Sequence, residues 1–142
     1  LVGLNATVRT QRRRIAAEQF FTGLFSTALE PGELVLAVHF PRVRRAGYCK
    51  FANPASGYVS TGAFVAVTEG GVRVAINGAS ACVFRQPAFE AALAQRFDPE
   101  ALRGLQHPSA GLQADLHASA EYRAQLVHVA TRRAVAMALA QA

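Results

Sequence analysis

Residues that hold metals or form disulfides are scarce in this chain. It has only two cysteines and four histidines among 142 residues, and no tryptophan. Cys49 and Cys82 stand 33 positions apart, no CxxC pair occurs, and the histidines are scattered singly. Structural zinc sites and iron–sulfur clusters need closely spaced thiolates or imidazoles. The sequence therefore argues against a metal centre held by this chain alone, and we expect both cysteines to be buried free thiols in strands.

Long hydrophobic runs are also absent. No apolar stretch approaches the roughly 18–20 residues that a membrane-spanning helix needs. A basic segment followed by an apolar one, the pattern of a secretory signal peptide, is not visible. With 51% hydrophobic and 17% charged residues, we expect a folded cytoplasmic domain without a membrane span. Because the chain begins with Leu1 and not with methionine, we expect it to be a fragment of a longer protein.

Acidic residues are few. Nine aspartates and glutamates stand against fifteen lysines and arginines, which gives a formal net charge of +6. This charge suits a nucleic-acid-binding domain, but the arginines form two short clusters, at 12–14 and 42–45, that flank turn-like breaks. No strand with interleaved aromatic and basic residues is present. We therefore interpret the two arginine clusters as solvated turns or as a patch that faces a partner subunit. No nucleic acid is expected as a partner.

Strand patterns come first in the chain and helix patterns last. Strands are expected over 1–9, 33–40, 47–53, 58–68 and 72–83. The segment 15–25 is expected to be a short helix or irregular, with Phe20, Phe21, Leu24 and Phe25 turned inward. Helices are expected to begin at Pro87 and at Pro99, and a last helix is expected over 120–141. The hairpin turn at 69–71 makes the last three strands an antiparallel meander. We therefore predict an α+β fold, in which a meander of three to four strands is packed on one side by about three helices.

The terminal helix carries arginines on or beside its apolar stripe. At 100° per residue the stripe consists of Tyr122, Leu126, Val129, Arg133, Met137 and Ala140, and Arg123 lies beside it. Leaving an arginine unpaired on a buried face costs several kcal/mol. We therefore expect Arg123 and Arg133 to tie the helix to the sheet or to the irregular segment 104–116, and Arg123 to have a carboxylate or several carbonyl groups as partners. A contact with a ligand or another protein is the alternative.

Four segments, taken in order, resemble one protein family. They are FFTGLFSTALEPGELVLAVHFP (20–41), GYCKFANPASGYVSTGAFVAV (47–67), VAINGASACVFRQPAFEAALA (74–94), and SAEYR (119–123) followed by RRA (132–134). Together they are similar to the FAD-binding medium subunit of molybdenum hydroxylases, of the carbon monoxide dehydrogenase and xanthine dehydrogenase type. The similarity covers nearly the whole chain and depends on the combination and order of the segments.

The resemblance implies a domain organisation and a role. Residues 1–40 would be the tail of a preceding FAD-binding domain, and residues 41–142 a domain like the C-terminal domain of carbon monoxide dehydrogenase flavoproteins. Such an oxidoreductase subunit passes electrons from iron–sulfur clusters on a small subunit through FAD to an acceptor, while a molybdopterin-binding large subunit oxidises the substrate. Glycine-rich loops hold the flavin phosphates in that family. This sequence has no such loop, so we expect FAD in the full-length subunit and none bound by this fragment.

Two residues are candidates for cofactor binding. In the family that the chain resembles, an aromatic side chain of the C-terminal domain approaches the flavin ring. Tyr48 stands at that position here, and Lys50 stands at a second family position. An aromatic ring can shield the isoalloxazine, and a nearby lysine would favour an anionic reduced ring. Because side chains alternate along a strand, Tyr48 and Lys50 should face a cleft while Cys49 and Phe51 face the core. No catalytic and no metal-binding residue is predicted.

Two other functions remain open at this point. One is a stand-alone α+β protein-interaction module without a redox role. The other is an RNA- or DNA-binding domain that uses the arginine clusters, which requires salt-dependent binding to nucleic acid. Within the resemblance, the loop 52–57 lacks the charged residues that are common there in relatives, so the substrate of the parent complex is also open.

Overall fold

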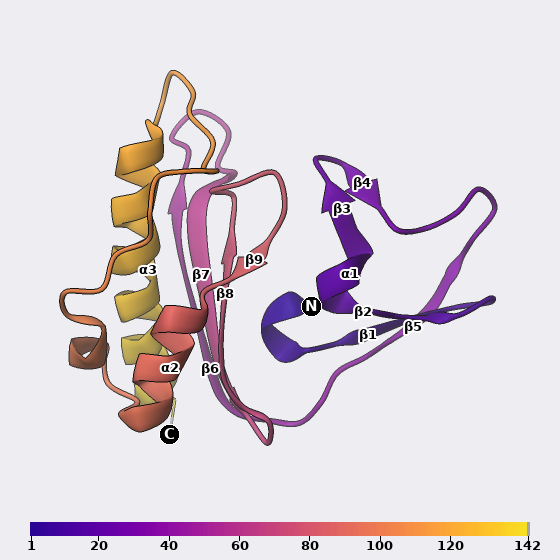
Figure 1. Cartoon of the computed structure of the whole chain (residues 1–142), viewed down its shortest axis with the longest axis horizontal. Coiled ribbons are helices and arrows are strands. Elements are labelled where there is room, and N and C mark those ends of the chain that lie inside the picture. The colour runs from indigo at the N-terminus through magenta and orange to yellow at the C-terminus, as the bar shows by residue number, and fades with distance from the viewer. Residues whose placement is uncertain (142) are drawn as a thin grey trace.

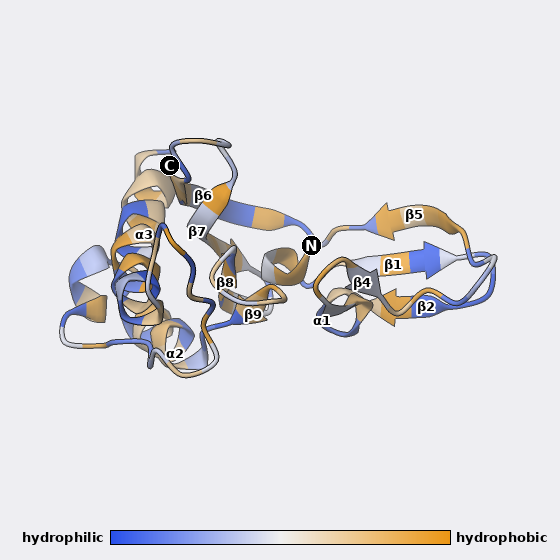
Figure 2. Cartoon of the chain, turned by 90° about the horizontal axis from the view of Figure 1, so that it is seen from above, coloured by the Kyte–Doolittle hydropathy of each residue, from blue (hydrophilic) through white to orange (hydrophobic). Residues whose placement is uncertain are grey.

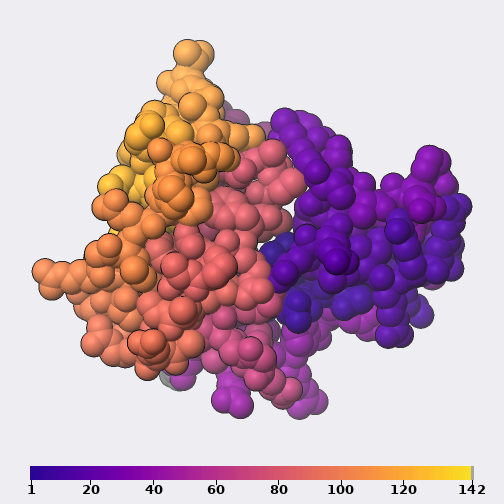
Figure 3. Space-filling view, in the orientation of Figure 1, coloured from indigo at the N-terminus to yellow at the C-terminus, as the bar shows by residue number. Residues whose placement is uncertain are grey.

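The computed structural model describes residues 1–141, which form two lobes (Figure 1). We call residues 1–40 the N-terminal lobe and residues 43–141 the C-terminal lobe. In a space-filling view the two lobes lie against each other side by side (Figure 3). The elements of the N-terminal lobe are the 3-10 helix η1 (Val2–Leu4), β1 (Thr7–Thr10), β2 (Arg14–Ala16), α1 (Ala17–Phe20), β3 (Phe21–Gly23), β4 (Ser26–Thr27) and β5 (Val35–His39).

The N-terminal lobe is built around a small antiparallel sheet. Its strand order is β2-β1-β5, and β3 and β4 form a separate hairpin. A core of Val8, Ile15 and Phe20 lies between these elements. The expected strand over 1–9 is wrong in its first half, where residues 2–4 form a 3-10 helix. The inward position expected for Leu24 and Phe25 is also wrong, because these two residues form the turn of the β3–β4 hairpin and are exposed.

A buried carboxylate holds the connections of this lobe together. Glu33 has no exposed side-chain surface. It accepts hydrogen bonds from the hydroxyl of Thr10 at 2.7 Å, from Nε of Arg13 at 3.0 Å and from the backbone N–H of Glu30 at 2.8 Å. These donors, with the guanidinium of Arg13 first among them, lower the pKa of Glu33 to about 2. Glu33 therefore stays ionised and fixes the segment that leads into β5.

The C-terminal lobe is a four-stranded meander with helices on one face. Its sheet has the order β6-β7-β8-β9, and all neighbours are antiparallel. The elements are β6 (Val43–Ala52), β7 (Val59–Thr68), β8 (Gly71–Asn77), β9 (Phe84–Arg85), α2 (Pro87–Gln95), the 3-10 helix η2 (Pro99–Leu102) and α3 (Ala120–Ala140). In Figure 1, α2 and α3 lie on the side of the sheet that faces away from the N-terminal lobe. The predicted α+β fold is confirmed.

Helix α3 packs very closely on the sheet. A Cβ atom at Gly47 would lie 2.0 Å from the carbonyl oxygen of Ala134, so only glycine allows this approach. The buried face of α3 consists of Arg123, Leu126, Val127, Ala130, Thr131, Ala134, Val135 and Ala138. The stripe predicted from the sequence is therefore largely wrong, although its Leu126 is buried as predicted. Tyr122 and Met137 are exposed, and Arg133 is an exposed side chain whose guanidinium lies 5.1 Å from the ring centre of Phe51.

Arg123, by contrast, is buried and paired as expected. Its guanidinium donates to the carboxylate of Asp115 at 2.6 Å, to the carbonyl oxygen of Gly78 at 3.2 Å and to the carbonyl oxygen of Ser60. Asp115 belongs to the irregular segment before α3, and the two carbonyl groups belong to the sheet region. A single side chain thus joins the helix, the sheet and the loop.

The two lobes meet on the face of the sheet that the helices leave free. There, Arg73 of β8 donates to the carbonyl oxygen of Val2 at 2.9 Å and forms an ion pair with Glu18. Arg85 forms a second ion pair with Glu18 at 3.1 Å. The hydrogen bond from Arg73 is the main reason why the pKa of Glu18 lies below its ordinary value. Between residues 1 and 141, none of the helices is long and apolar enough to cross a membrane.

Candidate functional site

The free face of the sheet carries both predicted site residues. Cys49 and Phe51 pack against the core beneath the helices. Because side chains alternate along β6, Tyr48 and Lys50 point to the opposite face, and both are exposed. The alternation expected from the sequence is confirmed. Tyr48 therefore lies on the same side of the sheet as the N-terminal lobe.

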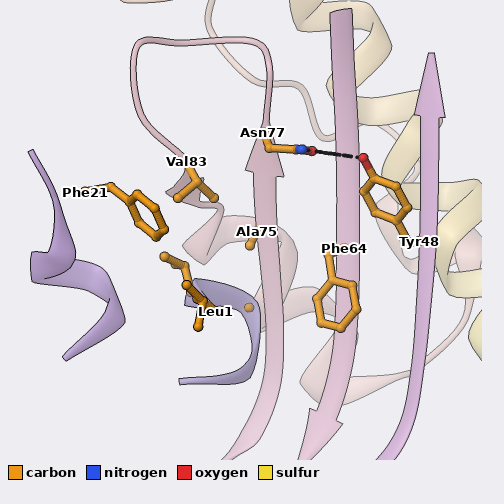
Figure 4. A pocket seen from close by; sticks show the side chains of 9 residues that line it. Leu1, Phe21, Tyr48, Phe64, Ala75, Asn77 and Val83 are labelled. Carbon is orange, nitrogen blue, oxygen red and sulfur yellow. Dashed lines mark hydrogen bonds between the residues drawn. The ribbon is translucent and has the colours of Figure 1, made fainter. Parts of the chain in front are cut away.

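The register of the sheet brings Tyr48 close to Asn77 of β8. Tyr48 pairs with Phe64, whereas Lys50 pairs with Gly62, which in turn pairs with Asn77. The Tyr48 side chain leans across Gly62, so that its hydroxyl lies 3.4 Å from the amide nitrogen of Asn77 (Figure 4). A Cβ atom at Gly62 would lie 2.5 Å from Oδ1 of Asn77 and 2.7 Å from the Tyr48 hydroxyl. The glycine is thus the reason why these two side chains can meet across β7.

A cavity of about 300 Å³ lies between the sheet and the N-terminal lobe. In Figure 4 the ring of Phe64 and the Tyr48–Asn77 pair rise from the sheet, while Leu1 and Phe21 approach from the opposite lobe. The lining residues are Leu1, Val2, Gly3, Phe21, Tyr48, Phe64, Ala75, Asn77 and Val83. The walls are apolar, and the only polar side-chain groups are the hydroxyl of Tyr48 and the amide of Asn77. This arrangement suits a flat, apolar ring with one hydrogen-bonding edge.

Lys50 lies on the same face but outside this cavity. Its ammonium group donates to the carbonyl oxygen of Gly57 at 3.4 Å, in the loop between β6 and β7. The side chain is exposed and is not part of the cavity lining. The structure thus brings Tyr48 and Asn77 together and leaves Lys50 beside them. The prediction that Lys50 contributes to flavin binding stays a prediction.

The chemistry of the cavity fits the ring of a flavin but not its phosphates. An aromatic side chain and an amide are suited to the face and the edge of an isoalloxazine. A pyrophosphate needs several backbone N–H groups or cations, and no charged side chain lines this cavity. The Gly70–Gly71 turn lies at the other end of β7, where Gly71 pairs with Thr68, six residues from Gly62 and about 20 Å away at the rise of a strand. Residues 1–141 also contain no group of three metal-ligating side chains.

Several cavity residues were missed by reasoning from the sequence. Asn77 could have been found, because the hairpin turn at 69–71 fixes the register of β7 and β8 and places Asn77 opposite Gly62. Phe21 was expected to turn inward but not toward this cavity, and Val83 carried no signal. Phe21 comes from the other lobe, and Val83 comes from the loop before β9, so only the packing of the two lobes brings them to the cavity.

Comparison with known proteins identifies relatives of the whole chain. No protein-family model matches it. The nicotine 6-hydroxylase medium subunit of Paenarthrobacter nicotinovorans is 31% identical over 149 residues, which cover 95% of this chain and 53% of that protein. Carbon monoxide dehydrogenase from Oligotropha carboxidovorans has a matching structure with a TM-score of 0.81 and 25% identity, over 99% of this chain and 55% of that one.

A third match concerns the fold alone. Quinoline 2-oxidoreductase from Pseudomonas putida 86 has a TM-score of 0.70 and 21% identity, over 99% of this chain and 54% of that one. In each of these comparisons the chain spans about half the length of the protein that it matches.

Proposed function

This chain belongs to the family of FAD-binding medium subunits of molybdenum hydroxylases, whose C-terminal portion it matches, and we propose that it works as part of such an oxidoreductase subunit. In this proposal the full-length subunit takes electrons from iron–sulfur clusters and passes them through FAD to an acceptor. The iron–sulfur clusters belong to a small partner subunit, and the substrate is oxidised on a large molybdopterin-binding partner subunit.

The observation that carries the proposal is the cavity beside Tyr48. Its apolar walls and the Tyr48–Asn77 pair suit the flavin ring, and its lack of charged side chains fits a site that does not hold the phosphates. Bound FAD would supply the electron-carrying ring. The residues of this chain would do three things: Tyr48 would border the ring, Asn77 would orient the Tyr48 hydroxyl, and Phe64 would exclude water from the same wall.

The proposal includes the division of the chain at residue 40. The N-terminal lobe would be the tail of the FAD-binding domain, and residues 41–142 the following domain. In support, the sheet of the N-terminal lobe has only three strands, and its edge strand β5 exposes Val35, Leu36 and Val38 (Figure 2). An exposed apolar edge strand is typical of a surface that further protein covers.

We also propose that the protein works in the cytoplasm. Cys49 and Cys82 are both free thiols, as is usual where glutathione and thioredoxin keep cysteines reduced.

The test compares the full-length subunit with the 142-residue chain. We expect the full-length subunit to retain a stoichiometric amount of FAD through gel filtration and to have its flavin absorbance bleached by the reduced iron–sulfur subunit. We expect the 142-residue chain to be folded and colourless. A folded full-length subunit without flavin, or with a flavin that the iron–sulfur subunit does not reduce, would contradict the proposed function.

A further inference from the structure

A chain of charged groups joins the two walls of the cavity beside Tyr48. Glu18, from α1 of the N-terminal lobe, forms ion pairs with Arg73 and with Arg85 of the C-terminal lobe. Arg73 also donates to the carbonyl oxygen of Val2 at 2.9 Å, and Val2 lines the cavity from the N-terminal lobe. We call the three side chains of Glu18, Arg73 and Arg85 the interlobe clamp.

The interlobe clamp lies directly beside the cavity along β8. Because side chains alternate along a strand, Arg73, Ala75 and Asn77 point to the same face of the sheet. Ala75 and Asn77 line the cavity, and Asn77 hydrogen-bonds to the hydroxyl of Tyr48. Arg73 is therefore the next side chain on this face after the floor of the cavity. A movement of its partner Val2 changes the width of the cavity itself.

The C-terminal lobe holds its half of the interlobe clamp in place. Glu90 of α2 is buried and accepts from Nε of Arg85 at 2.9 Å and from the backbone N–H of Val74 at 2.9 Å. The side chain of Arg73 is only 11% exposed. Side chains that are already fixed lose little conformational entropy when they pair, so the two guanidinium groups form a rigid seat for the carboxylate of Glu18.

The apolar contacts between the lobes are small and not directional. The buried apolar cluster at their boundary consists of Val2, Ala6, Ala17 and Ala75. Three of these four residues are alanines, whose single methyl groups bury little apolar area. Within residues 1–141, residues 41 and 42 form the single backbone connection between the lobes (Figure 1). The interlobe clamp therefore supplies the directional contacts that the apolar cluster lacks.

We propose that Glu18 and Arg73 are positioning residues that set the width of the flavin-ring cavity and keep water away from the bound ring. This inference rests on the proposed function, which places the ring beside Tyr48. Neither Glu18 nor Arg73 lines the cavity, so both act through the 3-10 helix η1, to which Arg73 is tied by its hydrogen bond to Val2. A ring held in a dry cavity is surrounded by fixed protein groups in place of mobile water.

The helix η1 rests directly on the sheet wall of the cavity. A Cβ atom at Gly3 would lie 2.5 Å from Cδ1 of Phe64 and 3.2 Å from Cβ of Ala75, so there is no space between η1 and these two side chains. Without the charge of Glu18, Arg73 keeps only its hydrogen bond to η1 across the boundary. The helix then lifts from the sheet more often, which admits water to the ring.

The first measurement is the accessibility of the flavin in the full-length subunit to acrylamide, a neutral quencher of flavin fluorescence. Glu18→Gln keeps the shape of the side chain and removes its charge. Because the Glu18 side chain is 42% exposed, we expect a several-fold rise in the quenching constant and in the Kd of FAD, and not a larger one. Glu100→Gln is the matched control, since it breaks the exposed ion pair with Arg132 inside the C-terminal lobe, and it should change neither value.

A second variant shows whether Glu18 and Arg73 act together. Arg73→Gln removes the ion pair and the hydrogen bond to Val2, so it should raise the quenching constant more than Glu18→Gln does. If the two residues act through one clamp, the double variant should show less than the combined effect of the two single variants. Independent, fully additive effects would contradict this coupling.

Amide hydrogen exchange in the same full-length samples reports on the interlobe clamp whether or not flavin is bound. The N–H groups of residues 4–6 donate to the carbonyl oxygens of Leu1 and Val2. They should exchange several-fold faster in Glu18→Gln than in Glu100→Gln. A subunit that holds FAD but shows equal quenching or equal exchange in these two variants refutes the inference alone. A subunit without FAD refutes the proposed function, and faster exchange in Glu18→Gln would then still support the interlobe clamp.

Discussion

Replacing Arg123 with alanine is predicted to destabilise the C-terminal lobe more than any exposed substitution on α3. The side chain of Arg123 is 4% exposed and donates to three groups that come from different parts of the lobe. The substitution removes the charge and the aliphatic stem together. It also leaves the carbonyl groups of Ser60 and Gly78 without this donor, at a place where α3 closes over the sheet.

The magnitude follows from the exposure of the partners. Breaking one side of a fully buried ion pair costs about 3–5 kcal/mol, and a hydrogen bond to a charged group contributes about 1.5–3 kcal/mol. The side chain of Asp115 is 48% exposed, so water can replace the arginine at that carboxylate. The cost is therefore carried by the two carbonyl groups and the lost stem packing. We expect Arg123→Ala to lower the free energy of unfolding by about 2–4 kcal/mol.

Urea denaturation followed by far-UV circular dichroism measures this loss. Arg123→Lys should recover only part of the stability, because an ammonium group cannot reach three acceptors as a guanidinium does. Arg133→Ala is the matched control on the same helix, since Arg133 is exposed, and it should cost no more than about 1 kcal/mol. A loss at Arg123→Ala as small as that at Arg133→Ala would refute the structural role assigned to Arg123.

Two further predictions concern the packing and the pH dependence. Gly47→Ala places a Cβ atom 2.0 Å from the backbone oxygen of Ala134 and should destabilise by about 1–3 kcal/mol. Gly62→Ala meets the movable ends of Tyr48 and Asn77 and, at 3.1 Å, a methyl group of Val59, but no backbone atom, and should cost less than about 1 kcal/mol. Equal losses in thermal denaturation would contradict this contrast. Glu33 has a folded-state pKa of about 2 against an ordinary value of 4.5, so its stabilisation is present above pH 4.5 and is lost as the pH falls toward 2. Urea titrations across this pH range should show a smaller pH dependence in Glu33→Gln than in the parent chain, and identical slopes would contradict the buried pairing with Arg13.

Local patterns were sufficient to predict the long strands β6, β7 and β8 in outline and the starts of α2, η2 and α3. The period-2 pattern placed Tyr48 and Cys49 on opposite faces of the sheet, because a half-buried strand alternates strictly. Ser119 caps α3 by accepting from the N–H of Tyr122 at 3.2 Å, and Asp98 caps η2 by accepting from the N–H of Glu100 at 2.7 Å. Each of these features is decided by residues within three positions of each other, so the sequence alone carries the information.

The failed predictions depend on partners that lie far away in the sequence. The buried face of α3 is rich in alanine because the helix lies so close to Gly47 that larger side chains would not fit. Periodicity favours large apolar residues, so it selected Tyr122 and Met137 and gave too little weight to Ala130 and Ala134. The cavity beside Tyr48 was predictable only in part, since its second wall comes from a separate lobe.

The midpoint potential of the flavin in the full-length subunit tests the central claim most directly. An aromatic contact of about 0.5–1.5 kcal/mol that differs between the oxidised and reduced ring corresponds to about 10–30 mV for a two-electron couple. Tyr48→Ala should therefore shift the potential by about this amount while the FAD content and the thermal stability stay nearly unchanged. Tyr122→Ala, which removes an exposed tyrosine from α3 beyond the opposite face of the sheet, should leave the potential as it is. A flavin potential that is the same in Tyr48→Ala, in Tyr122→Ala and in the unmodified subunit would contradict the placement of the flavin ring beside Tyr48.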